Sequence, residues 1–87
     1  MTEEQVVAFL RYPAAGLVEY ALSLANLSWK EETAITLCAR RGMTQEKAAE
    51  SVSYSVDAFQ RWYRSGIKKL MTAWAGHEWI LKVIDGD

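Results

Sequence analysis

The side chains with the clearest chemical capacity lie close together in the second half of the chain. Gln60, Arg61 and Arg64 fall within about one helical turn. In the major groove of DNA, glutamine can form two hydrogen bonds with adenine, and arginine can do so with guanine. Lys68 and Lys69 follow, and lysines suit the phosphates, which position a protein on DNA without specifying a sequence. The pattern predicts a helix that contacts double-stranded DNA.

Positive charge gathers in the same segment. The net charge of the chain is −1, yet residues 56–72 hold four basic side chains and one acidic one, a balance of +3. Residues 1–26 and 73–87 are each at −2, and residues 27–55 are neutral. A basic segment would attract phosphates to the predicted helix. The alternative, which the sequence leaves open, is an ordinary solvated helix face.

A helix-turn-helix over residues 44–64 would position these side chains. Thr44 is placed to cap a first helix, and Ser55 is placed to cap a second. Ala49 falls where a larger side chain would push the two helices apart. Ser53 falls in the turn, where glycine is common because the backbone is left-handed there. The positions expected to face inward are Ala48, Ala49, Val52, Tyr54, Phe59 and Trp62.

The predicted contact residues are the positions that this packing leaves exposed, together with the lysines that follow. Most of them belong to the second helix, Ser55–Ser65. Thr44 is added because a hydroxyl and the backbone N–H groups at the start of a helix can bind phosphate. The candidates for DNA contact are Thr44, Ser55, Val56, Asp57, Gln60, Arg61, Arg64, Lys68 and Lys69.

Helix signals also fill the first half of the chain. Thr2 with Gln5, and Ser28 with Glu31, have the spacing of a capping box, in which two residues satisfy the free N–H groups of a helix start. Pro13 should end the first helix just before it, because the residue before a proline disfavours the helical conformation. Three helices are therefore expected before residue 42.

The second half adds two or three more helices. Gly42 suits the left-handed end of the third helix, and apolar residues then continue at helical spacing from Phe59 to Trp74. Gly66 interrupts this run, and close packing against a neighbour would explain it. We predict an all-α fold, a compact five- to six-helix domain containing a helix-turn-helix. Its parts are a helical support (1–26), the helix-turn-helix core (27–70) and a C-terminal tail (75–87), all within one domain (1–87).

Several classes of function lack the residues that they need. Cys38 is the only cysteine, so it has no partner for an internal disulfide and no ligand set for zinc. No Ser-His-Asp set, metal-spaced cluster or phosphate-binding glycine loop is present, so we expect no enzyme activity, no cofactor and no metal. No apolar run is long enough to span a membrane, and the acidic N-terminus does not match a secretory signal. We expect a cytoplasmic protein.

The chain resembles the fourth region of bacterial sigma factors and its phage and mobile-element relatives. The residues that carry this resemblance are Leu27, Ser28, Glu31, Ile35, Leu37, Gly42, Thr44, Glu46, Ala49, Ser55, Phe59, Arg64, Lys68, Lys69 and Leu70. The resemblance implies that the helix Ser55–Ser65 enters the major groove while its neighbours touch phosphates. Gln60 and Trp62 depart from the family, in which many members have arginines. Because the other sigma regions are missing, we expect a small stand-alone transcription regulator.

Two further interpretations concern partners. The chain could instead be a protein-interaction module that contacts RNA polymerase or another partner through the helix-turn-helix scaffold or the apolar tail. A homodimer is a second interpretation, because a single helix-turn-helix reaches few bases. The tail residues Trp79, Ile80, Val83 and Ile84 could form the dimer contact or could close the back of the domain's own core, and the sequence leaves both open.

Overall fold

A computed structural model describes residues 1–86, which contain helices and no strands. This confirms the predicted all-α fold. Asp87, the last residue of the predicted tail, lies outside the described residues. The helical elements are α1 (Glu3–Leu10), α2 (Ala15–Ser23), α3 (Trp29–Ala34), the π-helix η1 (Ile35–Arg40), α4 (Gln45–Ser51), α5 (Val56–Trp74) and α6 (Glu78–Asp85).

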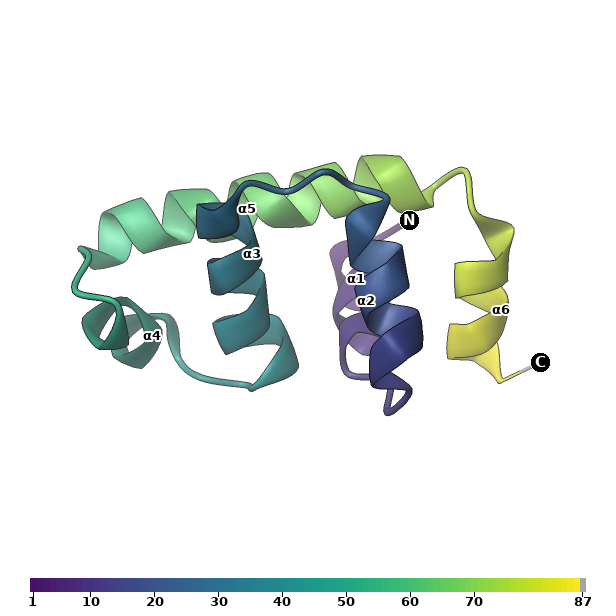
Figure 1. The fold of residues 1–87 in the computed structure, drawn as a ribbon, viewed down its shortest axis with the longest axis horizontal. Coiled ribbons are helices and arrows are strands. Elements are labelled where there is room, and N and C mark those ends of the chain that lie inside the picture. The colour runs from purple at the N-terminus through teal and green to yellow at the C-terminus, as the bar shows by residue number, and fades with distance from the viewer. Residues whose placement is uncertain (87) are drawn as a thin grey trace.

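The long helix α5 organises the molecule. Its 19 residues correspond to about 28 Å at 1.5 Å per residue, in a molecule whose longest dimension is 40 Å. Figure 1 shows α5 extending along this dimension, with α4 beneath its N-terminal end and α6 beyond its C-terminal end. The helices α3, α1 and α2 lie between them, on the same side of α5. One helix therefore links the two ends of the molecule.

Side-chain caps begin four of the helices at the predicted positions. Thr2 and Ser28 each form a complete capping box with the residue three positions later. The hydroxyl of Thr44 accepts a hydrogen bond from the N–H of Lys47, and that of Ser55 accepts one from the N–H of Ala58. Each cap satisfies a backbone donor that would otherwise lack a partner.

The third predicted helix is divided into two parts. After α3, the chain continues as the wider π-helix η1, at whose end the N–H of Arg41 donates to the carbonyl of Thr36 at 3.0 Å. Gly42 follows with φ of 71°, which is the left-handed conformation predicted for it. The chain can therefore turn sharply from η1 into α4.

Two apolar clusters form the core. The larger one joins α1, α2, η1, α6 and the second half of α5. The smaller one consists of Ala34, Ala48, Ala49 and Phe59, and it joins α3, α4 and the first half of α5. Tyr63 packs against both clusters. The smaller cluster holds the part of α5 that carries most of the predicted contact residues.

The tail residues complete the larger cluster. Ile80 is fully buried, and Trp79, Val83 and Ile84 are partly buried against the same cluster. The prediction of a dimer contact is therefore wrong for Ile80, whose side chain has no surface to offer a second copy. For this residue the core alternative is correct.

Gly66 marks the closest approach of α5 to the α3–η1 segment. A Cβ atom at this position would lie 3.0 Å from Cγ1 of Ile35 and 3.4 Å from Cβ of Glu31. Both neighbours are buried, so neither can move away freely. This confirms the prediction that Gly66 allows close packing.

The substitution Gly66→Ala should therefore destabilise the protein, by about 1–2 kcal/mol, because overpacking outweighs the gain in helix propensity. Gly16→Ala is the matched control. A Cβ atom on Gly16 in α2 would meet nothing within 4 Å, so this change should stabilise by about 0.5–1 kcal/mol. Urea denaturation followed by circular dichroism measures both, and an equal gain in both variants would contradict the packing argument.

Candidate nucleic-acid interface

A tight turn connects α4 to α5. The N–H of Ser53 donates to the carbonyl of Glu50 at 3.1 Å, and the N–H of Tyr54 donates to that of Ala49 at 3.0 Å. Ser53 has φ of 61°, a left-handed conformation that costs a residue with a side chain roughly 1–2 kcal/mol. The fully buried ring of Phe59 then packs in the small cluster with Ala48 and Ala49. These contacts fix the first half of α5 against α4.

The outward face of α5 carries four charged side chains, namely Asp57, Arg61, Arg64 and Lys68. All four are exposed, and their spacing of four, three and four residues places them on one side of the helix. The opposite side holds the buried residues Phe59, Gly66 and Leu70. The structure therefore brings together three of the predicted basic residues and Asp57 in one row, which we call the outward row.

The other predicted contact residues lie at the edges of this row or outside it. Gln60 is half-buried beside it, and Val56 is half-buried and packs against the smaller cluster. The hydroxyls of Thr44 and Ser55 are exposed, although each already accepts the capping hydrogen bond of its helix. The sequence identified the row but also included neighbours that contribute to packing and capping.

Lys69 lies on another side of α5, where it binds Glu31 of α3. Its Nζ atom donates to Oε1 of Glu31 at 2.7 Å, and the hydroxyl of Ser65 donates to Oε2 of the same carboxylate. Burial alone would raise the pKa of Glu31, but hydrogen bonds from Lys69, Ser65 and Ser28 outweigh it and lower the pKa to about 2. A phosphate contact by Lys69, as predicted, would compete with this internal bond.

An exposed aromatic group beside the turn was not foreseen. Trp29 is 62% exposed, and Tyr54 is 42% exposed, although Tyr54 was expected to face the core. Tyr54 instead packs edge-on against Trp62, with ring centroids 4.6 Å apart. The Nζ atom of Lys30 lies 5.3–5.9 Å from the three ring centroids, within the range of a cation–π contact. The expectation for Tyr54 was wrong: Phe59 and the two alanines belong to the smaller buried cluster, and Tyr54 does not pack against it.

The exposure of Trp29 follows from the burial of Glu31. Two helical positions correspond to about 200°, so a residue two places before Glu31, which faces α5, points away from that helix. No local pattern in the sequence predicts that Lys30 would reach Tyr54, because Lys30 belongs to α3 and Tyr54 to the turn between α4 and α5. The aromatic group therefore depends on the packing of α3 beside the α4–α5 turn.

The part of the chain that the structure describes contains neither a metal-binding cluster nor a membrane-spanning helix. Within residues 1–86, no three His, Cys, Asp or Glu side chains gather closely enough to hold a metal ion. None of the helices there is both long and apolar enough to cross a membrane. Comparisons of the chain with models of protein families, with curated proteins and with solved structures give no match.

Proposed function

We propose that this protein is a sequence-specific DNA-binding transcription regulator that inserts the N-terminal half of α5 into the major groove. The observation that carries the proposal is the basic part of the outward row. Arg61, Arg64 and Lys68 are exposed side by side on a helix whose opposite side is buried. The only ion pair among residues 1–86 joins Lys69 to Glu31, so these three cations have no acidic partner at contact distance.

The spacing of the outward row supports distinct roles for its members. Arg61 and Arg64 are three residues apart, about 4.5 Å along the helix, which is close to the 3.4 Å rise of one base pair. They are suited to the edges of neighbouring bases, and guanine offers the acceptors that arginine needs. Lys68 lies farther from the start of α5 and is suited to a phosphate. Gln60, at the edge of the row, is suited to adenine.

The resemblance to the fourth region of sigma factors agrees with this assignment of α5. By that resemblance, the protein would act in the cytoplasm as a small regulator of a phage or mobile element, alone or together with RNA polymerase. A second copy would extend the number of bases contacted. The partly buried residues Trp79, Val83 and Ile84 remain the candidates for such a dimer contact, and sedimentation of the protein would test it.

Binding to a labelled duplex that carries the protein's own upstream region tests the proposal directly. We expect fluorescence anisotropy to show binding that weakens as the salt concentration rises, because phosphate contacts release counterions. Arg61→Ala and Arg64→Ala should each weaken binding about tenfold, since a good arginine–guanine pair contributes about 1–3 kcal/mol. Lys68→Ala should lower the logarithmic salt slope by about one.

The matched control is Lys82→Ala, which removes one exposed positive charge from α6, beyond the other end of α5. This variant should bind DNA almost as tightly as the wild type. A wild-type signal that does not respond to DNA, or does not depend on salt, would contradict the proposal. Equal losses of DNA affinity in the Lys82 and Arg61 variants would show that binding depends on the net charge of the protein and not on the outward row.

The second candidate function is a protein-interaction module. The observation that favours it is the exposed aromatic group of Trp29 and Tyr54, since large aromatic side chains are enriched at protein interfaces. If this candidate is correct, a pull-down from the native host should recover a partner with the variant in which Arg61 and Arg64 are both changed to alanine. The same partner should not be recovered with Trp29→Ala. Loss of the partner in the arginine variant but not in Trp29→Ala would contradict this second candidate.

A further inference from the structure

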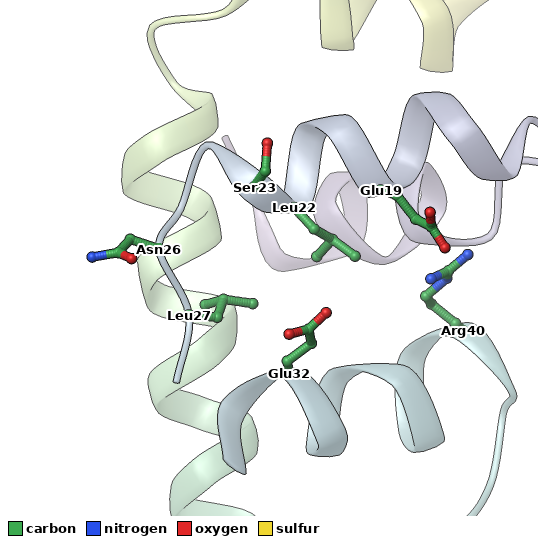
Figure 2. A pocket seen from close by; sticks show the side chains of 7 residues that line it. All are labelled: Glu19, Leu22, Ser23, Asn26, Leu27, Glu32 and Arg40. Carbon is green, nitrogen blue, oxygen red and sulfur yellow. The ribbon is translucent and has the colours of Figure 1, made fainter. Parts of the chain in front are cut away.

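A cleft of about 510 Å³ lies between α2 on one side and the α3–η1 segment on the other. This volume falls within the range of about 300–1,000 Å³ that is usual for small-molecule sites. Figure 2 shows the cleft beside α5 and its seven lining side chains. The lining residues are Glu19, Leu22, Ser23, Asn26, Leu27, Glu32 and Arg40. None of them belongs to the outward row of α5.

Two leucines that pack in the larger core cluster form the floor of the cleft. Leu22 is buried within the larger core cluster, and Leu27 is partly buried against the same cluster. Both side chains point into the cleft, whereas Ser23 and Asn26 turn away from it (Figure 2). A small apolar group could therefore cover Leu22 and Leu27 without rearrangement of the core.

The rim of the cleft has excess negative charge. Glu19 of α2 and Arg40 of η1 point toward each other across it, while Glu32 of α3 points into the space between them and the leucines (Figure 2). Two carboxylates and one guanidinium give the lining a formal charge of −1. None of the three forms an ion pair within the described residues, where the only such pair is Lys69–Glu31. The lining therefore carries a net negative charge beside an apolar floor.

We propose that this cleft binds a small organic cation, a primary ammonium group on a short apolar body. The ammonium would donate hydrogen bonds to Glu32 and Glu19, and the apolar body would cover Leu22 and Leu27. A simple anion would meet two carboxylates, and Arg40 would have to offset both of them. A bound cation would bridge the helical support (1–26) and the helix-turn-helix core (27–70), and its binding does not depend on the proposed DNA contact.

Three compounds with the same branched apolar body separate the charge requirement from simple apolar contact. Isoamylamine is the cation, leucine is the zwitterion and isocaproate is the anion. Each is titrated into isotope-labelled protein at neutral pH, and the backbone amide signals of the lining residues are followed by heteronuclear NMR. We expect isoamylamine to shift these signals saturably with a millimolar dissociation constant, leucine to bind more weakly and isocaproate to produce no saturable shift.

Two substitutions in the lining should change the affinity for isoamylamine in opposite directions. Glu32→Gln should weaken the binding of isoamylamine about tenfold, because the ammonium then meets a neutral amide oxygen, and a hydrogen bond to a charged group contributes more than one to a neutral group. Arg40→Gln should strengthen it, because the change removes a nearby positive charge. Glu50→Gln and Arg41→Gln are matched controls at exposed positions outside the lining, and they should have no effect.

The same titrations can overturn the proposal. It fails if isocaproate binds as well as isoamylamine, or if Glu32→Gln and Arg40→Gln change affinity in the same direction. It also fails if no compound shifts the lining residues at millimolar concentration. None of these results affects the DNA-binding proposal, which the anisotropy measurements test separately.

Discussion

Replacing Trp74 with alanine should lower the free energy of unfolding by about 3–5 kcal/mol, the usual cost of removing a large aromatic side chain from a core. Trp74 is almost completely buried near the end of α5. Its ring packs edge-on against Phe9 of α1, with centroids 5.1 Å apart, and its indole Nε1 donates to the carbonyl of Ala21 in α2 at 2.8 Å. One side chain therefore holds three helices together.

Two controls separate the causes of this loss. Trp74→Phe removes the indole N–H but keeps most of the packing, and the carbonyl of Ala21 still accepts the N–H of Leu24 at 3.1 Å. We expect this variant to lose only about 1–2 kcal/mol. Trp29→Ala removes a side chain that is 62% exposed and should cost less than about 1 kcal/mol. Chemical denaturation measures all three, and similar losses at positions 29 and 74 would contradict the role given to Trp74.

The features of the fold that depend on neighbouring residues were predictable from the sequence. The helix starts at Thr2, Ser28, Thr44 and Ser55 were predictable because a cap depends on residues only three positions apart. The left-handed turn at Gly42 was predictable for the same local reason. Helical spacing also predicted the buried side of α5, and therefore the outward row opposite to it.

Contacts between distant segments were not predictable in this way. The spacing of Lys69 places it on a side of α5, but it does not show that Glu31, 38 residues earlier, faces that side. Lys69 consequently looked like another phosphate contact. Val56 and Gln60 looked fully exposed for the same reason, although both are half-buried at the edge of the row. Helical spacing predicts the direction of each side chain around α5, whereas the neighbours of that side chain depend on tertiary packing.

The carboxylate of Glu31 should make the free energy of unfolding fall in acid, and this is the second large effect that we expect. Its pKa is lowered from 4.5 to about 2 in the folded protein, so folding favours the charged form. A depressed carboxyl pKa contributes stability above pH 4.5, and this contribution is lost as the pH falls from 4.5 toward 2. The shift corresponds to about 3 kcal/mol at neutral pH, and we expect about 2–3 kcal/mol because solvent at the half-exposed Lys69 weakens the ion pair.

The substitution Glu31→Gln tests this assignment. Glutamine can still accept the hydrogen bonds of Ser28 and Ser65, but it has no charge for Lys69 to neutralise. The variant should therefore be less stable than the wild type at neutral pH and should approach it below pH 3, since protonation removes the same charge from the wild type. Glu32→Gln, a change at the exposed neighbouring residue, should keep the wild-type acid dependence. If Glu31→Gln kept that dependence as well, another carboxylate would be responsible, and the link between α3 and α5 through Glu31 would contribute little to stability.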